Sequence, residues 1–514
     1  MMKGPISGRA VILVRYTAEH FRNDQAMNDK VVLVLDCGAT NVRTVAVNQD
    51  GMIVAHHGVP NNTRPDPLLD GGKIWDVDEI WQKFMTTTRE VVKQIPSKEI
   101  VAITVTTFGV DGAPFDMDGR MLYPVISWKC LRTESAMRHI NRYMPLETLY
   151  RISGVQPFSF NTIAKLIWLL EHHSRILDRT AMFLFLPSIF NYFLTGRMVN
   201  DATMAGTSML TDLKKRGFSR EIFSSLGLSP GLFSDLVEPG SVVGPLQPKP
   251  AAHLGLPVGV PVVAAGHDTQ FAIFGAGATE HIPVLSSGTW EILMVRAGSV
   301  NPDQDLLESG VTTELDPIPG LYNPGIQWIA SGTLEWIARS FYPELAGKDG
   351  LYESMISEAA SHPAGSNGVF VNPDFLNVSG GLNKGLLGGL HMETPRGAIY
   401  RATLEALAFK TSRSLKMLEQ TCSFKAPQMI CVGGGSKNDL WNQIRADVLG
   451  LPVETIEQKE TTVLGAAMFA FFGAGLFDTP QTAMASIQTR GTVFHPGRDQ
   501  KSYQELEEAY GQIL

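Results

Sequence analysis

The chain has 514 residues, more than one hydrophobic core usually serves, so two domains are predicted. Hydrophobic residues make up 44% of it and charged residues 18%, which is typical of a folded enzyme and excludes a mostly disordered or fibrous chain. The net charge of -8 gives no electrostatic reason to expect nucleic acid or an anionic membrane as a partner.

The cysteines are few and scattered, without the close paired spacing of a zinc site: Cys37, Cys130, Cys422 and Cys431. A reduced, cytoplasmic protein is therefore expected. The paired histidines, His56 with His57 and His172 with His173, lack helical i,i+4 spacing, so they do not indicate a metal site.

The start of the chain predicts an extension over residues 1–30. Its one apolar run, AVILV, is too short for the apolar region of a secretory signal. No segment reaches the roughly 18 apolar residues of a membrane helix. The richest stretch, AMFLFLPSIFNYFLTG, is interrupted by Pro187 and Asn191 and is expected in the buried core.

The fold is expected to begin near Val31 with VVLVLD, which has strand composition. The turn CGAT, a second strand VRTVAV, the turn NQDG and a third strand MIVAHHG follow, so three antiparallel strands are predicted. Apolar residues at helical spacing then predict a helix over 77–95, and VAITVTTFG predicts a buried strand.

The first turn has residues suited to holding phosphate. Gly38 lets the backbone approach a ligand, the Thr40 hydroxyl and neighbouring N–H groups are donors, and Arg43 adds positive charge. A carboxylate such as Asp36 beside phosphates makes sense if Mg²⁺ lies between them through water. The alternative is a hairpin whose Asp and Thr only satisfy the turn.

The segment PVLSSGTWEILMV, residues 283–295, repeats the pattern of strand, small-residue turn and strand about 250 residues later. One Ser-rich hairpin is most often structural. Two of them, one in each half, indicate a duplicated domain with nucleotide in the cleft between the halves.

Two further motifs place polar or flexible residues after a strand. In 261–269 an apolar run leads to Gly266, His267, Asp268 and Thr269, where Asp268 is a candidate general base; the alternative is that Asp268 or Thr269 caps the next helix.

In 428–449 a strand, three glycines and a helix make a loop on which a nucleoside or phosphate can lie, although the motif alone is weak. No GxxxxGK[ST] motif occurs, which disfavours a P-loop NTPase.

In this order, DCGATNVR, GHDTQ, LSSGTW and VGGGSKNDLWNQIRADVLGLPV resemble the FGGY carbohydrate kinases over residues 31–480. The resemblance implies an α/β fold of two actin-like (ribonuclease-H-like) domains, each with a mixed five-stranded sheet, closing on ATP and sugar. The expected bounds are 31–265 for the sugar and first phosphate domain, 266–480 for the nucleotide domain and 481–514 for a C-terminal helical extension. The Pro- and Gly-rich stretch over 238–262 is expected to be an irregular connection.

The resemblance also implies the site. Asp268 matches the catalytic base that deprotonates O1 of a ketose, and Asp36 lies near Mg²⁺. The positions that match ATP-binding residues are Asp36, Thr40, Asn41, Arg43, Ser287, Gly288, Thr289, Ser331, Gly434 and Gly435. The positions that match sugar-binding residues are Gly109, Asp111, His267, Thr269 and Asn323.

The expected reaction is ATP-dependent phosphorylation of L-fuculose at O1. L-rhamnulose, D-ribulose and D-xylulose stay open as substrates, and rhamnulokinases share WDVD and GVD with this chain. A non-catalytic sugar sensor would have little need for Asp268 and both hairpins, and an actin- or chaperone-like ATPase should carry an added segment. The roles of Lys129 and Arg132 stay open, as does a homo-oligomer.

Overall fold

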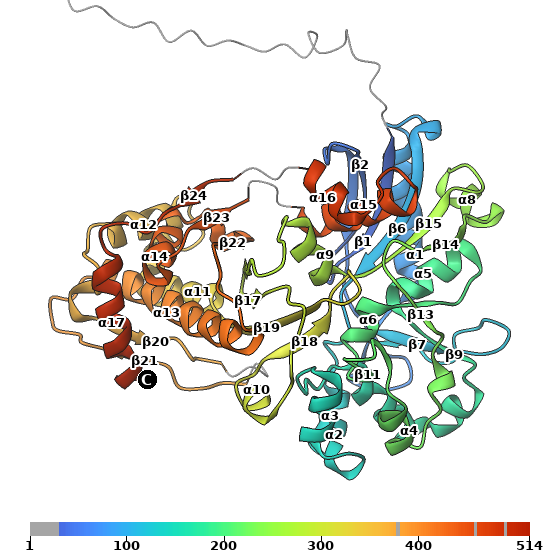
Figure 1. Ribbon diagram of the computed structural model, residues 1–514, viewed down its shortest axis with the longest axis horizontal. Helices are drawn as coiled ribbons and strands as arrows, with labels where there is room; N and C mark the ends of the chain where they lie inside the picture. The colour runs from blue at the N-terminus through green and yellow to red at the C-terminus, as the bar shows by residue number, and fades with distance from the viewer. Residues whose placement is uncertain (1–29, 377–380, 457–459, 488–490, 514) are drawn as a thin grey trace, which may run out of the picture.

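The computed structural model describes residues 30–376, 381–456, 460–487 and 491–513, and these form two α/β halves side by side (Figure 1). Each half is built on a mixed sheet with helices packed on it, as expected for the two-domain fold. The predicted N-terminal extension lies, except for Lys30, outside the described residues.

The first sheet has six strands in the order β14-β15-β6-β1-β2-β3. The predicted meander is confirmed, since β1 pairs antiparallel with β2 and β2 with β3, while β1, β6 and β15 run parallel. The strand bounds are β1 (Val31–Cys37), β2 (Asn41–Asn48), β3 (Ile53–Pro60), β6 (Ile100–Thr107), β14 (Val242–Pro245) and β15 (Pro261–His267).

Both faces of this sheet are covered, which is why β1 reads as a continuous apolar run. Val31, Leu33 and Leu35 pack into a core with helices α1 (Val77–Val92) and α5 (Leu186–Thr195). Val32 and Val34, which point to the opposite face, pack with α9 (Asp268–Gly275) and α15 (Thr461–Gly473). The helix predicted over 77–95 is thus confirmed, ending three residues earlier, and the apolar stretch around Pro187 lies in the core as expected.

Helix α15 reaches the first sheet although the strands just before it in the chain belong to the second. It packs on α9 where two glycines face each other; an added Cβ on Gly275 would lie 2.6 Å from the Gly465 nitrogen. The chain thus crosses between the halves more than once. The predicted domain limits of 265, 266 and 480 stay a prediction.

The second sheet has seven strands in the order β18-β19-β17-β16-β22-β23-β24. The predicted hairpin of residues 283–295 is confirmed as β16 and β17, and the predicted strand, glycine loop and helix as β22 and α14. The strand bounds are β16 (Val284–Ser287), β17 (Trp290–Met294), β18 (Thr312–Leu315), β19 (Tyr322–Ile329), β22 (Met429–Val432), β23 (Val453–Thr455) and β24 (Val493–Phe494). The packed helices include α11 (Ser331–Phe341), α12 (Leu351–Ala360), α13 (Arg396–Cys422), α14 (Asp439–Leu449) and α17 (Gln500–Ile513).

Two expectations about the sheets are wrong. The sheets have six and seven strands rather than five each, because short edge strands extend them. The stretch 238–262 is not an irregular connection: β14 pairs with β15 at the sheet edge, and Pro248 starts helix α8 (Pro248–Leu254), where a proline at the first turn is tolerated. The C-terminal helix is confirmed as α17, which packs on α14 and buries Tyr503.

A third, mainly helical layer lies between β6 and β14 in the chain and packs beside the first sheet. Its elements are β7 (Gly112–Phe115), β8 (Val125–Ile126), α2 (Glu134–Arg138), α3 (Leu146–Ser153), α4 (Thr162–Arg179), β9 (Met182–Phe185), β10 (Asn200–Asp201), α6 (Ala202–Gly206), β11 (Thr211–Asp212), β12 (Gly217–Phe218), α7 (Arg220–Ser225) and β13 (Leu236–Val237). The shorter elements elsewhere are β4 (Arg64–Pro65), β5 (Lys73–Trp75), α10 (Gln304–Glu308), β20 (Phe370–Asn372), β21 (Leu386–Gly388) and α16 (Pro480–Ser486).

Among the described helices, none is both long and apolar enough to cross a membrane. All four cysteines are buried and free.

Candidate active site

The carboxyl ends of β1, β6 and β15 meet at one edge of the first sheet because these strands are parallel neighbours. Asp36 in β1 is opposite Thr106 in β6, and Thr107 is opposite His267 at the end of β15. Asp36 and Asp268 thereby lie close enough for the charge of Asp268 to raise the pKa of Asp36.

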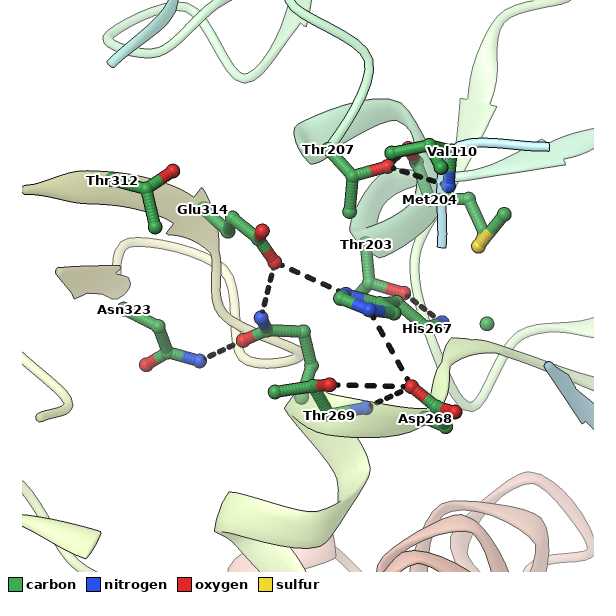
Figure 2. Close-up of polar contacts among 12 residues, drawn as sticks. Val110, Thr203, Met204, Thr207, His267, Asp268, Thr269, Thr312, Glu314 and Asn323 are labelled. Atoms are coloured by element: carbon green, nitrogen blue, oxygen red, sulfur yellow. Dashed lines mark hydrogen bonds and ion pairs between the residues drawn. The ribbon is translucent and has the colours of Figure 1, made fainter. Parts of the chain in front are cut away.

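Asp268 is the first residue of α9, and its side chain is 30% exposed. Its Oδ1 accepts hydrogen bonds from the Thr269 backbone N–H at 2.6 Å and from the Thr269 hydroxyl at 3.2 Å (Figure 2). His267 occupies the N-cap position, and no side chain caps the helix there, so capping does not account for Asp268. Burial raises the pKa of Asp268, while the charge of His267 and the Thr269 hydrogen bonds oppose that rise.

His267 is held from both halves of the molecule. Its Nε2 lies 3.4 Å from Asp268 Oδ1 and its Nδ1 lies 3.0 Å from Oε2 of Glu314, which comes from β18 in the second half (Figure 2). Burial lowers the pKa of His267, but the carboxylates of Glu314 and Asp268 outweigh burial, so the net pKa is raised. The two carboxylates therefore extend the pH range over which His267 is protonated and can donate from both nitrogens.

The same Glu314 oxygen accepts a hydrogen bond from Gln270 Nε2 at 2.6 Å, and Gln270 Oε1 accepts one from Asn323 Nδ2. Asn323 is fully buried behind Gln270. Glu314 was missed by sequence reasoning because nothing in the short strand TTEL marks it; its partner His267 is 47 residues away in the chain.

A cavity of about 300 Å³ opens beside Asp268 and His267, between the halves. Of the residues predicted to bind sugar, Gly109, His267 and Thr269 line it, whereas Asp111 and Asn323 do not. Most of the remaining lining is apolar or aromatic, and includes Trp128, Phe158, Phe160, Met294 and Ile326.

Asp111 is buried next to that cavity and holds its wall. Its Oδ2 accepts from Trp75 Nε1 at 2.7 Å and from the Trp128 backbone N–H at 3.0 Å, and Lys165 pairs with its Oδ1. Burial raises the pKa of Asp111 and lowers the pKa of Lys165. In this structure, Asp111 positions Trp128 and does not itself face the cavity.

The turn between Asp111 and β6 is strained at Val110, whose φ of 64° is left-handed and unusual for a β-branched residue. The Val110 carbonyl accepts hydrogen bonds from Thr162 Oγ1 and Lys165 Nζ, both at 2.8 Å, and its N–H donates to Thr207 Oγ1 at 3.1 Å. These bonds keep Gly109 and Val110 in the cavity lining.

The first predicted phosphate turn lies at the same sheet edge. Arg43 Nε pairs with Asp36 Oδ2 at 2.7 Å, and Arg43 Nη1 pairs with Glu460 at 2.7 Å. Burial raises the pKa of Asp36 to about 6, against the lowering effect of Arg43. Thr40 and Asn41 are exposed at the turn. The Gly38 N–H donates to the Asn41 carbonyl at 2.8 Å, and this bond closes the turn.

The second predicted phosphate turn joins β16 and β17. Thr289 is exposed at its tip and Gly288 is half-buried. Ser287 is buried instead: its hydroxyl donates to Glu291 Oε1 at 2.8 Å and accepts from Arg445 Nη2 at 3.0 Å. Ser287 thus anchors the turn to helix α14.

A second cavity, of about 440 Å³, lies in the second half, and the predicted nucleotide residues Ser331, Gly434 and Gly435 all line it. Tyr352, Tyr400, Lys437, Asn438 and Trp441 also line it, and these had not been predicted. Gly433, the residue before Gly434 in the chain, has φ 91° and ψ -169°, a conformation that only glycine adopts readily.

A third, smaller cavity of about 190 Å³ shares Asp268, Thr269, Ile292 and Met294 with the first. Its other lining residues include Ser286 in the second hairpin and Thr462 in α15. Asp268 therefore lies between the cavity of about 300 Å³ and the hairpin of the second half.

Models of known families match both halves. Residues 31–275 match the N-terminal domain of the FGGY family of carbohydrate kinases, and residues 284–474 match its C-terminal domain. The chain belongs to the FGGY family of carbohydrate kinases. As an FGGY carbohydrate kinase it takes a sugar and ATP as substrates.

Individual FGGY kinases match over nearly the whole chain. An L-fuculokinase of Escherichia coli (strain K12) is 46% identical over 480 residues, which cover 93% of this chain and 100% of that protein. An L-fuculokinase of Haemophilus influenzae (strain ATCC 51907 / DSM 11121 / KW20 / Rd) is 43% identical over 90% of this chain and 99% of that protein. The crystal structure of a xylulose kinase from Rhodospirillum rubrum shares the fold, with a TM-score of 0.85 at 24% identity over 94% of this chain and 98% of that chain.

The structure of this FGGY kinase shows the surroundings of Arg132 and Lys129, whose roles the sequence left open. The Arg132 side chain is buried, with Nη2 2.6 Å from Asp66 and Nε 3.1 Å from Cys130 Sγ, so it is structural. Lys129 Nζ donates to the Ala39 carbonyl of the first phosphate turn at 3.4 Å and lies over the rings of Trp75 and Trp128. Lys129 thus lies between that turn and Trp128, which lines the cavity of about 300 Å³.

Proposed function

We propose that this kinase transfers the γ-phosphoryl group of ATP to O1 of L-fuculose, giving L-fuculose 1-phosphate and ADP. The proposal is supported by the identity to L-fuculokinases over 93% of the chain. The structural observation behind it is the position of Asp268. This residue lines both the cavity of about 300 Å³ and the cavity of about 190 Å³ that reaches the second hairpin. A hydroxyl at that junction would contact the base and face the phosphates.

In the proposed mechanism Asp268 accepts the O1 proton as the oxygen attacks phosphorus. Thr269 holds the carboxylate through its N–H and hydroxyl, and the charge of His267 opposes the rise in the pKa of Asp268 that burial causes. Thr203 fixes the His267 backbone, since the His267 N–H donates to its hydroxyl at 3.0 Å. Such positioning supplies most of the catalysis in phosphoryl transfer.

The ATP phosphates are proposed to lie between the two turns. Thr40, Asn41 and Arg43 would face them from the first turn, and Gly288 and Thr289 from the second. The adenosine would occupy the cavity lined by Ser331, Gly434 and Gly435. Ser287 is proposed to act only by holding its turn, because Glu291 and Arg445 engage its hydroxyl.

Mg²⁺ is the proposed metal cofactor, and the residues fit it. Within the described part of the chain no group of three or more His, Cys, Asp or Glu side chains forms a metal cage. Magnesium bound to a nucleotide needs only one or two carboxylates, because water and phosphate supply the other ligands. Asp36, a buried carboxylate with its pKa raised to about 6, would hold the ion through water, and the ion would neutralise charge on the phosphates.

The test is an ADP-release assay of the purified protein with Mg-ATP and L-fuculose, L-rhamnulose, D-ribulose or D-xylulose. We expect the highest kcat/KM with L-fuculose. A preference for another of the four would reassign the substrate, and ATP binding without turnover on any of them would favour a sugar sensor. Because ATP and reduced thiols belong to the cytoplasm, we expect the enzyme there.

A further inference from the structure

The cavity of about 300 Å³ beside Asp268, proposed above to hold the sugar and called the sugar cavity below, is lined by chemically different groups. Asp268, Thr269, Ile292 and Met294 line both the sugar cavity and the smaller cavity toward the second hairpin, so they mark the end where phosphate arrives. Val155, Phe158 and Phe160 line the sugar cavity alone. These three side chains do not reach the smaller cavity, and all three are apolar.

The aromatic side chains of this lining are packed as a platform. The rings of Phe158 and Phe160 are stacked, with centroids 5.0 Å apart and planes 12° apart. The Trp128 ring meets Phe160 edge-on at 6.3 Å. Val155 is buried, with 2% of its surface exposed. The Phe158 and Phe160 rings and the Val155 side chain offer contact area without a hydrogen-bonding group, whereas Trp128 Nε1 beside them is a buried donor without a hydrogen-bond partner among the described residues.

The loop that carries the platform is fixed by its own hydrogen bonds. The Phe158 N–H donates to the Gln156 carbonyl at 2.8 Å, and the Asn161 N–H donates to the Phe158 carbonyl at 3.0 Å. Asn161, a polar lining residue on this loop, donates its Nδ2 to the Gln156 carbonyl at 2.7 Å. The backbone thus engages one of the two amide hydrogens of Asn161.

The second half also anchors this loop. Gln156 Nε2 donates to the carbonyls of Leu307 at 2.9 Å and Val311 at 3.0 Å, both from the segment that leads to β18. Gln156 is buried, so these bonds are shielded from water. These bonds link the loop that carries Val155, Phe158 and Phe160 to the second half of the molecule.

We propose that Val155, Phe158 and Phe160 receive the C6 methyl group of a 6-deoxyketose and so determine the choice of sugar. This inference rests on the proposed function, because O1 at Asp268 places C6 at the opposite end of the sugar. A methyl group is stabilised by leaving water for this wall. A hydroxymethyl group would lose its hydrogen bonds to water there without gaining a partner.

Three ketoses with the same configuration at C3 and C4 separate the effect of the methyl group. L-fuculose carries a methyl group at C5, L-tagatose a hydroxymethyl group, and D-ribulose only hydrogen. We expect wild-type enzyme to prefer L-fuculose to D-ribulose by about 10-fold to 200-fold, the usual worth of one methyl-sized group in an apolar pocket. L-tagatose should bind more weakly than L-fuculose by about tenfold or more.

The variants are Val155→Thr, which adds a hydroxyl at nearly constant volume, and Phe158→Ala, which opens the platform. Val91→Thr is the matched control, because Val91 is fully buried in α1 within the core of the first half, away from the cavity. Dissociation constants are measured by calorimetry without ATP, and kcat/KM by ADP release. Binding thereby tests the wall separately from phosphoryl transfer.

We expect Val155→Thr to narrow the L-fuculose to L-tagatose ratio of dissociation constants about fivefold or more, with the control within about twofold of wild type. If Val155→Thr does not fold, Phe158→Ala provides the same comparison. Equal binding of the three sugars by wild type, or ratios unchanged in both wall variants, would overturn the inference. Methyl-dependent binding with no turnover would support the inference and refute the proposed function.

Discussion

Oδ1 of Asp268 lies 3.4 Å from Nε2 of His267, and this contact opposes the effect of burial on the pKa of the proposed base. Burial alone would raise the pKa of Asp268 and keep the carboxyl protonated over more of the pH range. The neighbouring imidazolium, kept charged by Glu314 on its other side, favours the carboxylate. His267 therefore limits the rise in the pKa of Asp268 that burial causes.

Asp268→Asn should lower kcat by about 10²-fold to 10⁴-fold, because an amide cannot accept the O1 proton. ATP affinity should stay within a few-fold of wild type, since the base acts only in the transition state. Steady-state turnover and nucleotide binding by calorimetry give the two readouts. Near-normal turnover would remove Asp268 from the role of base.

His267→Gln should move the acid limb of the pH profile of kcat/KM to higher pH. The base works as a carboxylate, so activity falls as pH drops through its pKa. Removing the imidazolium removes an interaction that lowers that pKa, so the loss of activity begins at a higher pH. His56→Gln, at an exposed position on β3, is the control and should leave the limb in place. A limb that moves to lower pH would contradict the argument.

Arg445→Met should destabilise the protein by about 3–5 kcal/mol, because it leaves Glu291 buried without its ion-pair partner. It should also raise the KM for ATP, since Arg445 and Glu291 together hold Ser287 in the turn that is proposed to bind phosphate. The partly exposed Arg396, which pairs with Glu344 and Glu358, provides the comparison: Arg396→Met should cost about 0–1 kcal/mol. Urea unfolding midpoints test this, and equal losses in both variants would refute it.

Gly433→Ala should lower both stability and ATP affinity. Its φ of 91° is unfavourable for alanine, at a cost of about 1–3 kcal/mol, and the added Cβ would lie 2.6 Å from the Ser287 carbonyl oxygen. Gly434→Ala separates the two effects. Its Cβ meets no atom within 4 Å, so stability should hold, while its place in the nucleotide cavity should weaken ATP binding alone. Unfolding temperature and calorimetry distinguish the outcomes; an unchanged Tm in Gly433→Ala would disprove the strain argument.

Much of the site could be predicted from the sequence because its motifs are local. Alternating and continuous apolar runs identified β1, β2, β16 and β22, and the residues that follow a strand lie at its carboxyl end whatever the rest of the fold does. Asp268 beside a cavity and Gly434 in another follow from that rule. The edge strand β14 was missed because prolines and glycines dominate its surroundings.

By itself, the sequence determined the three-stranded meander, the two small-residue turns and the residues at several strand ends, since each depends on neighbours a few positions away. Only the tertiary structure decided which side chains meet. Glu314 contacts His267 from 47 residues away, Lys165 pairs with Asp111 from 54, and Arg445 reaches Glu291 from 154. Such pairs depend on how two sheets and their helices pack, and packing leaves no periodic signal in the chain. For the same reason Asp111 and Asn323, both predicted to bind sugar, do not line the cavity: Asp111 accepts from the backbone N–H of Trp128, which lines it, and Asn323 donates to the Gln270 side chain.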